Sequence, residues 1–316
     1  MNIMLTAFCN RKCSYCFAIK EMSKYRNKGE NTEISLNNLN IVIKFLKKSG
    51  IPDFRMIGGE PTLHSRFKEI YNIISDNGFN VTIFTNGIFD KSKRIFLSKK
   101  KNLNILLNVN HPKDYIKGIR DVVLRTIIEL NEEIILGFNI YKIDFNPQFL
   151  LKLIEKYKIR QRKIRLGIAN PILTGNNVYI DLKDHRKIAN RIVDFSRQCN
   201  KLDIALSFDC GFILCAFTKE QLGELYYNVG SVPKFNCSAP IDVAPDLKLF
   251  YCFSLSDNSE EKLNDFKDIF EVKKHFDDKL KVLKRIGGME RCFNCKHLKR
   301  QQCVGGCIAH TLRSLH

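Results

Sequence analysis

The sequence predicts an α/β fold in which a parallel sheet curves into a partial or full barrel, followed by a small cysteine-rich region. Over residues 1–200, short apolar runs alternate about six times with amphipathic helical patterns, as in consecutive parallel β/α units. From about residue 201 this rhythm stops, and eight of the 12 cysteines fall between residues 210 and 307. We therefore expect two domains, residues 1–200 and residues 201–316.

The expected elements follow one another in a regular order. A first strand leads into a loop with three cysteines, and the polar stretch 20–32 predicts a mobile connection. A helical pattern then begins after Ser35, which can cap it, and ends at Gly50. The remaining alternation predicts strands over 54–57, 80–87, 103–110, 134–141 and 163–169, and helices over 67–78, 91–100, 116–131, 147–157 and 183–199.

Length and composition favour a protein with a buried core and without a membrane span. The chain has 316 residues, of which 44% are hydrophobic, and no stretch approaches the roughly 18 apolar residues that a spanning helix needs. Residues 1–8 are too short for a signal peptide and run directly into Cys9. We therefore expect a cytoplasmic protein, in which cysteines bind metal or carry out redox chemistry more often than they form disulfides.

The net charge of +19 is unevenly distributed. Residues 201–316 contain 17 Lys and Arg against 15 Asp and Glu, so nearly all of the excess lies in residues 1–200. Such a charge favours an acidic partner, for example a peptide or a nucleic acid. A lysine-rich, solvated surface without such a partner explains the same numbers, and both interpretations stay open.

Three cysteines near the N-terminus carry the strongest chemical signal. Cys9, Cys13 and Cys16 are separated by three and then two residues, and no other cysteine follows until Cys199. Three thiolates on one loop can hold three corners of a cubane iron–sulfur cluster and leave the fourth iron open. An iron with a vacant site can bind and activate a small molecule, so the spacing indicates chemistry as well as a metal.

A second motif, Gly58-Gly59-Glu60-Pro61, ends the second expected strand. Together with the cysteine loop after the first strand, it resembles the radical S-adenosylmethionine (SAM) superfamily, which implies a partial (β/α)6 barrel. The resemblance implies that the three N-terminal cysteines hold a [4Fe–4S] cluster whose open iron takes the amino and carboxylate groups of SAM. It also implies that an electron from this cluster breaks the S–C5′ bond, and that the 5′-deoxyadenosyl radical abstracts a hydrogen atom from the substrate.

The resemblance further implies which residues contact SAM. Tyr15 would lie near the adenine, the two glycines would let the backbone approach the ligand, and Glu60 with neighbouring carbonyls would accept from the amino group. Polar residues at the ends of the next two strands are placed to line the pocket, although strand ends are often polar for no functional reason. The expected SAM contacts are Tyr15, Gly58, Gly59, Glu60, Pro61, Thr85, Asn86, Asn108 and Asn110.

The spacing of the C-terminal cysteines resembles the auxiliary-cluster extension called SPASM, or its shorter relative Twitch. The resemblance has departures: Leu247 stands where a glycine is usual, and the cysteine that normally follows the position of Cys307 is absent. Two upstream cysteines restore the number to eight, enough for two four-thiolate [4Fe–4S] clusters. The expected auxiliary ligands are Cys210, Cys215, Cys237, Cys252, Cys292, Cys295, Cys303 and Cys307.

Two other assignments of these cysteines stay open. One is a single auxiliary cluster with spare cysteines, and the other is a tetrahedral zinc site in which His297 or His310 replaces a thiolate. In each case we expect the region to depend on its metal for folding. Cys199 is expected to be a buried helix residue without chemistry.

Radical SAM enzymes with such extensions mostly modify peptides, so we expect a peptide maturase that forms a thioether or other cross-link, or epimerises a residue. The expected partners are a precursor peptide with an acidic leader, a reductant such as ferredoxin or flavodoxin, and no membrane. Because the chain begins at the first barrel strand, the leader would bind the barrel surface or a separate protein.

Three other functions are weighed against this one. Phe253 stands where sulfatase maturases have an aspartate, which argues against that role. A radical SAM enzyme acting on RNA or a small molecule is the first alternative. A zinc-ribbon nucleic-acid-binding protein is the second, although the small positive charge of residues 201–316 argues against it.

Overall fold

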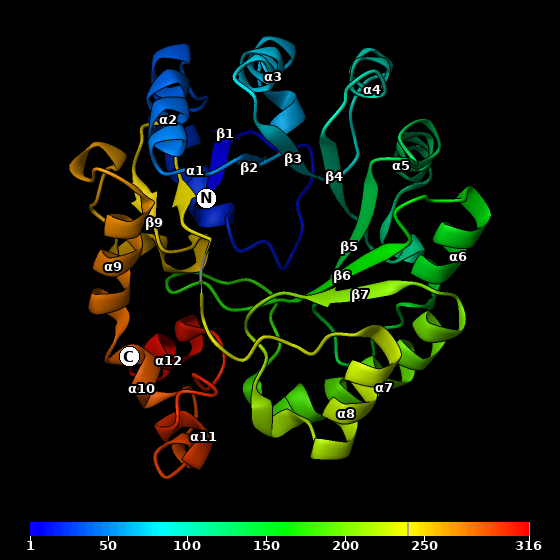
Figure 1. Cartoon of the computed structure of the whole chain (residues 1–316), viewed down its shortest axis with the longest axis vertical. Coiled ribbons are helices and arrows are strands. Elements are labelled where there is room, and N and C mark those ends of the chain that lie inside the picture. The colour runs from blue at the N-terminus through cyan, green and yellow to red at the C-terminus, as the bar shows by residue number, and fades with distance from the viewer. Residues whose placement is uncertain (239, 316) are drawn as a thin grey trace.

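The computed structural model describes residues 1–238 and 240–315, and its strands form one nine-stranded sheet (Figure 1). The strand order is β7-β6-β5-β4-β3-β2-β1-β8-β9, and every neighbouring pair is parallel except β8 and β9. The strands are β1 (Asn2–Thr6), β2 (Asp53–Gly58), β3 (Asn80–Thr85), β4 (Leu103–Asn108), β5 (Ile134–Ile140), β6 (Lys163–Ile168), β7 (Ala205–Phe208), β8 (Asp242–Val243) and β9 (Leu249–Phe250).

The strands curve into a partial barrel with helices around its outside (Figure 1), which confirms the expected α/β class. Ser35 caps the second helix as expected, because its side chain accepts from the Asn38 N–H. The helices are α1 (Ile19–Lys28), α2 (Leu36–Lys48), α3 (Phe67–Asp76), α4 (Lys91–Leu97), α5 (Lys117–Glu129), α6 (Gln148–Tyr157), α7 (His185–Lys201), α8 (Lys219–Val229), α9 (Ile269–Leu280), α10 (Leu283–Ile286), α11 (Lys296–Lys299) and α12 (Ile308–Ser314).

The expectation of a mobile connection over residues 20–32 is wrong, because most of this stretch is helix α1. Met22 and Tyr25 are buried in a small apolar cluster that also contains Met4 and Phe250. The Tyr25 hydroxyl donates to Asp246, which ties α1 to the turn between β8 and β9. Two buried apolar residues on a mostly polar helix are too few to produce a clear periodic pattern. Part of the surface that covers them comes from a distant part of the sequence.

The parallel sheet does not end at residue 200. The strand β7 pairs with β6 beyond this point, and β8 pairs with β1 at the other end of the parallel series. Residues after 200 therefore contribute strands to both sides of the barrel. The division into functional domains at residues 1–200 and 201–316 stays a prediction.

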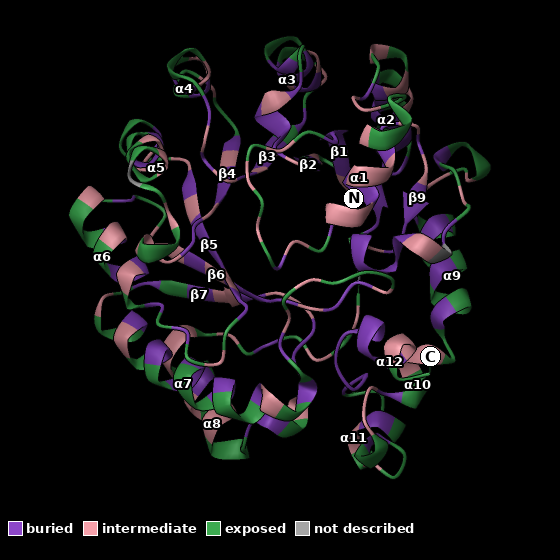
Figure 2. Ribbon diagram, turned by 180° about the vertical axis from the view of Figure 1, so that it is seen from behind, coloured by how far each residue is buried: buried purple, intermediate pink, exposed green. Residues whose placement is uncertain are grey.

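Burial follows the layers of the barrel. The strands and the inner faces of the helices are buried, and the outer faces of the helices are exposed (Figure 2). One contact crosses the interior: the Arg165 guanidinium of β6 lies 5.4 Å from the centre of the Phe84 ring of β3. These two strands are not neighbours, so their side chains meet inside the barrel. Among the described residues, every helix falls short of the length and hydrophobicity needed to cross a bilayer.

The helices α7 and α12 meet at two buried histidines. The rings of His185 and His310 are 6.5 Å apart, and neither nitrogen of His185 has a hydrogen-bond partner in the described structure. Burial lowers the pKa of His185 to about 4. Burying a ring without partners favours its neutral form, since the charged form would lose its hydration.

We expect this arrangement to make the fold sensitive to acid. As the pH falls below the ordinary histidine pKa, the unfolded chain takes up a proton at His185 while the folded chain does not, so the free energy of unfolding decreases. From the lowered pKa, the loss at pH 5 relative to pH 7 is about 2 kcal/mol. Urea denaturation of the wild type and of His185→Leu measures it. The variant should lose less stability between the two pH values, and equal losses would contradict the prediction.

Candidate active site

The three N-terminal cysteines lie on the loop that follows β1, and each is partly buried. The Cys16 N–H donates to the Cys13 carbonyl over 3.1 Å, which folds the loop tightly. Burial raises the pKa of Cys16 to about 12, and the charges of Cys13 and Cys9 raise it further, so the three thiols are close enough to interact. Three neighbouring thiols fit a cubane that takes one thiolate on each of three irons. Among the described residues, no group of three or more His, Cys, Asp or Glu side chains is arranged to hold a single metal ion.

The two glycines of the second motif pack directly against the cysteine loop. The Gly59 N–H donates to the Thr6 carbonyl and the Glu60 N–H to the Phe8 carbonyl, over 2.9 and 2.8 Å. A Cβ atom on Gly59 would lie 2.0 Å from the Phe8 oxygen, far inside van der Waals contact. Gly58, at φ +144°, would place a Cβ 2.5 Å from the Thr6 oxygen. We expected the two glycines to let a ligand approach the backbone closely. In the structure, they let the backbone at the start of the cysteine loop approach the end of β2 closely.

Glu60 is fully buried, and its carboxylate is already bonded within the protein. One oxygen accepts from the Thr62 N–H and hydroxyl and from the Thr85 hydroxyl, and the other accepts from the Asn86 N–H over 2.8 Å. Burial raises the pKa of this carboxyl, and these hydrogen bonds oppose the rise. The carboxylate therefore joins the ends of β2 and β3, and its expected contact with the SAM amino group stays a prediction.

Pro61, Thr85 and Asn86 also lie near this corner, and each makes a different contact. Pro61 is buried and begins a short 3-10 turn, Pro61–Leu63. Thr85 is buried with its hydroxyl bonded to Glu60, and its expected contact with SAM stays a prediction. Asn86 reaches the cysteine loop, because its Nδ2 lies 3.9 Å from the Cys9 sulfur and 2.8 Å from the Asn10 Oδ1.

Tyr15 and Asn110 are brought together as expected, but they bind each other. The Tyr15 hydroxyl donates to the Asn110 Oδ1 over 2.6 Å, and the Tyr15 ring stacks on Tyr141 with 4.5 Å between centres. One face of Tyr15 is therefore covered by protein, which leaves less of the ring for an adenine than expected. Asn108, at the end of β4, packs over Gly137 of β5, where a Cβ would lie 2.5 Å from its Oδ1.

The sequence did not single out three features of this site. Tyr141 covers Tyr15, and the loop after β6 reaches the cysteine loop through a Val178 N–H that donates to the Ser14 carbonyl over 2.8 Å. Inside the barrel, the Arg165 Nε donates to the Asp209 carboxylate over 2.7 Å. Alternating polarity along β6 was a possible signal for Arg165. The other two features are long-range contacts that no local pattern encodes.

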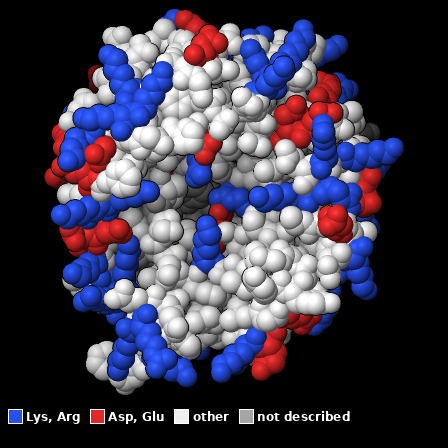
Figure 3. Space-filling model, in the orientation of Figure 1, with Lys and Arg blue, Asp and Glu red and all other residues white. Residues whose placement is uncertain are grey.

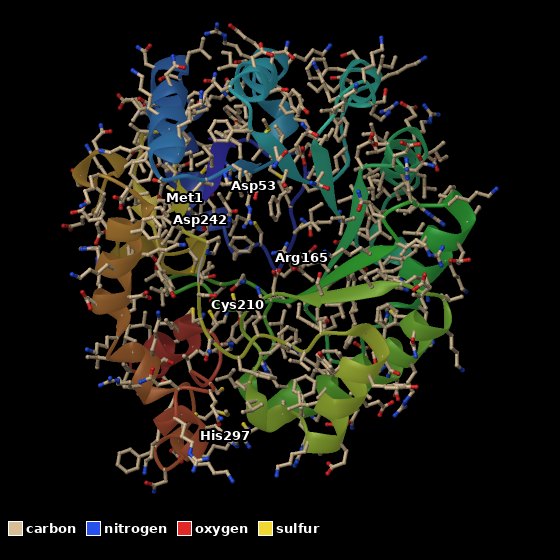
Figure 4. The ribbon with its side chains drawn as sticks, in the orientation of Figure 1. Met1, Asp53, Arg165, Cys210, Asp242 and His297 are labelled. Carbon is tan, nitrogen blue, oxygen red and sulfur yellow. The ribbon has the colours of Figure 1, made fainter. Side chains whose placement is uncertain are left out.

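The barrel interior opens onto one face of the molecule. Figure 3 shows a hollow at the centre of this face with Lys and Arg side chains beside it, and Figure 4 places Arg165 at the centre of the barrel. A pocket of about 500 Å³ also opens beside the aromatic pair, lined by Tyr141, Lys142, Asp144, Tyr179, Asp181 and Lys183 among others. This pocket is large enough to admit part of a substrate.

The eight C-terminal cysteines fall into two groups in space, which we call set 1 and set 2. Burial raises the pKa of Cys252 well above its usual range, and the nearest thiols that raise it further are Cys307, Cys237 and Cys210. Burial also raises the pKa of Cys215, which the charges of Cys303, Cys292 and Cys295 raise further while Arg291 lowers it. Set 1 is Cys210, Cys237, Cys252 and Cys307, and set 2 is Cys215, Cys292, Cys295 and Cys303.

The remaining candidates of this region lie apart from both sets. Cys199 is buried in α7, and burial alone raises the pKa of its thiol to about 12. His297 shares a hydrogen bond with Gln302, and His310 packs against Tyr179 and His185. Among the described residues, no hydrogen bond joins either histidine ring to a thiol, and the zinc arrangement with a histidine ligand stays a prediction from the sequence.

The fold and the three-cysteine loop define the class of this protein. Residues 3–144 match the model of the Radical SAM superfamily, so this part of the chain is a radical SAM domain. Members of this superfamily use a [4Fe–4S] cluster and SAM as cofactors. The cysteine loop on this chain, with its three neighbouring thiols and no fourth, fits that cluster.

Individual relatives resemble different parts of the chain. A nucleotide dehydratase dependent on SAM, from Selenomonas ruminantium, is 31% identical over 121 residues, which are 37% of this chain and 41% of the relative. A probable GTP 3′,8-cyclase of Saccharolobus islandicus is 27% identical over 207 residues, 62% of this chain and 65% of the relative. The match therefore spans less than two thirds of either protein.

A solved structure resembles nearly the whole chain. The crystal structure of SuiB from Streptococcus suis bound to its precursor peptide SuiA superposes with a TM-score of 0.66, covering 98% of this chain and 71% of that one. The sequence identity is only 19%, so the likeness concerns the fold. Because it covers 98% of the chain, the likeness includes the C-terminal region.

Proposed function

We propose that this chain cleaves SAM reductively and uses the radical to modify a peptide, by a cross-link or an epimerisation. The observation that carries the proposal is the pair of four-cysteine sets in a C-terminal region attached to a radical SAM barrel. This combination supports a SPASM-type enzyme. The fold likeness to a peptide-bound enzyme over 98% of the chain supports the same substrate class.

The chain's own residues have distinct roles in this proposal. Cys9, Cys13 and Cys16 hold the cluster, which when bound supplies the electron that opens the S–C5′ bond of SAM. Gly58 and Gly59 seat the cysteine loop on the end of β2, and their neighbouring carbonyls accept from the SAM amino group. Asn86 faces Cys9, and Tyr15 with Asn108 and Asn110 borders the adenosine side. Glu60, Pro61 and Thr85 stabilise the end of β2 through contacts within the protein.

The eight other cysteines hold two auxiliary [4Fe–4S] clusters in this proposal. Set 1 lies close to the barrel, since Cys210 follows the last residue of β7 by two positions and is partly buried near Arg165. Four thiolates complete the ligation of a cubane, so these clusters suit electron transfer better than substrate activation. Loading them also stabilises a region with little regular structure.

The peptide would enter through the hollow face of the barrel. Lys and Arg beside this hollow (Figure 3) suit an acidic leader or an acidic core sequence. An electron carrier such as ferredoxin or flavodoxin, a separate leader-binding protein and a cytoplasmic location remain predictions from the sequence.

A nucleotide is the second candidate substrate. The sequence relatives named above are a nucleotide dehydratase and a probable GTP cyclase. Arg165 and the cations beside the hollow would suit a phosphate as well as a carboxylate. The C-terminal region with its two sets favours the peptide.

One experiment separates the two substrates. The anaerobically purified protein is mixed with SAM, a reductant and either short peptides encoded beside its gene or the common nucleoside triphosphates. Release of 5′-deoxyadenosine above the uncoupled level, with a mass change in a peptide, supports the proposal. The same stimulation by a nucleotide, with a modified nucleotide as product and no change in any peptide, would replace it with the second candidate.

A further inference from the structure

We propose that the segment between β7 and α8 supplies one thiolate to each auxiliary cluster, with Cys210 completing set 1 and Cys215 completing set 2. The inference rests on the proposed function, since it concerns the ligands of its auxiliary clusters. It assigns the fourth ligand of set 2 to a residue more than seventy positions before the other three.

The segment is held in place by contacts of the residues between its two cysteines. Gly211, at φ +103°, sits so close to the loop after β6 that a Cβ would lie 2.7 Å from the Asn170 Nδ2. Ile213 is buried, and its Cγ2 would lie 3.3 Å from a Cβ on Gly306, the residue next to Cys307. Leu214–Ala216 then forms a short 3-10 turn that contains Cys215. The segment therefore runs from the barrel to the C-terminal cysteines within a few residues.

Two thiols of set 2 lie beside two glycines, and a tight turn brings the third cysteine close to them. A Cβ on Gly287 would lie 2.8 Å from the Cys292 sulfur, and one on Gly305 would lie 3.1 Å from it. The Gly305 N–H also points at the Cys303 sulfur over 3.3 Å. The Cys295 N–H donates to the Cys292 carbonyl over 3.0 Å, which closes a tight turn between these two ligands. The chain supplies three corners of a cubane here, and a fourth thiolate must come from elsewhere.

Cys215 is the remaining thiol beside this group. Cys215 follows the buried Ile213 by two residues, and Ile213 lies next to Gly306. The neighbouring Gly305 lies beside the sulfurs of Cys292 and Cys303. Cys210, separated from Cys215 by four residues, is partly buried, whereas Cys215 is exposed. Cys215 is therefore a specific probe, because ligation would protect an exposed thiol from modification.

Alkylation of the wild-type protein tests the assignment without any variant. Iodoacetamide is added to the anaerobically purified, iron-loaded protein and to the same protein after chelation, and each cysteine is quantified by mass spectrometry. We expect Cys215 to be protected at least tenfold in the loaded protein and to become reactive together with Cys292, Cys295 and Cys303. Cys199 is the internal control, because its burial in α7 does not depend on iron. Equal reactivity of Cys215 in both states would overturn the proposal.

Iron counting with variants tests which set each cysteine belongs to. The wild type and the matched control Cys199→Ala should contain about 12 irons per chain, and Cys210→Ala and Cys215→Ala about 8 each. The electron paramagnetic resonance spectrum of the reduced protein should lose a different auxiliary signal in each variant. Loss of the same signal in both, or stoichiometric zinc in the wild type, would refute the assignment. If either variant fails to fold, the alkylation result decides alone.

These measurements do not depend on the substrate. A chain that cleaves SAM and modifies a peptide but has an unprotected Cys215 would keep the proposed function and lose this inference. A chain with both clusters as assigned but without action on peptides would keep this inference and lose the proposed function.

Discussion

Replacing Cys13 with alanine is expected to abolish the release of 5′-deoxyadenosine from SAM. Cys13 is the middle ligand of the three-cysteine loop, and its backbone carbonyl accepts from the Cys16 N–H. Two remaining thiolates leave two irons of a cubane without a protein ligand, so the cluster with the open iron is lost. Activity should fall at least a thousandfold, below the limit of detection by chromatography. The iron content should fall by about 4 per chain while both auxiliary clusters remain.

The matched control for this variant is Cys199→Ala. It also removes one thiol from the chain, but from a buried position in α7 with no cysteine as a neighbour. It should keep its full iron content and its activity, at a cost in stability of about 1 kcal/mol for the small cavity. Full SAM cleavage by the Cys13 variant would refute the assignment of the loop to the cluster.

Replacing Gly59 with alanine is expected to be nearly as damaging, although the change adds a single methyl group. This group would lie 2.0 Å from the Phe8 oxygen and 3.0 Å from the Cys9 Cβ, so the cysteine loop leaves it no free space. The cysteine loop must therefore move away from the end of β2. We expect SAM binding to weaken at least tenfold, which corresponds to about 1.4 kcal/mol, and the cluster to be lost faster in air. Equilibrium dialysis with labelled SAM measures the first effect.

Gly223→Ala provides the control for this substitution. Gly223 lies within α8, and no atom lies within 4 Å of a Cβ added there. An alanine in a helix interior should stabilise the protein by about 0.5–1 kcal/mol and leave SAM binding unchanged. Unchanged SAM binding in the Gly59 variant as well would mean that the loop tolerates displacement and that the contact has no functional importance.

The barrel was predictable because its pattern is local and repeated. Each strand of the parallel series is a short apolar run, each helix has an amphipathic period, and Ser35 and Gly50 mark helix ends by their own chemistry. The pattern failed where burial came from distant residues. Helix α1 buries Met22 and Tyr25 against Met4 and Phe250, and β7 has only four residues, too few for a periodic signal.

The candidate site was predictable in its residues and less so in their contacts. Glu60 lies beside the cysteine loop at the end of β2, but its carboxylate already accepts hydrogen bonds from Thr62, Thr85 and Asn86. Tyr15 lies beside the cysteine loop, but it is stacked on Tyr141, which no pattern indicated. Hydrogen-bond capacity is finite, so a polar side chain placed near a site can already be satisfied by its neighbours.

The sequence alone determined the chemistry of this protein. Three cysteines spaced for a cubane, the Gly58–Pro61 motif and an alternating β/α series require nothing beyond their order along the chain. Only the tertiary structure decided which atoms meet. It seated Gly59 on the cysteine loop and divided eight cysteines into set 1 and set 2, with Cys215 beside Cys292. A spacing along the chain fixes neighbours within one loop, whereas partners far apart in sequence are chosen by how the strands and helices pack.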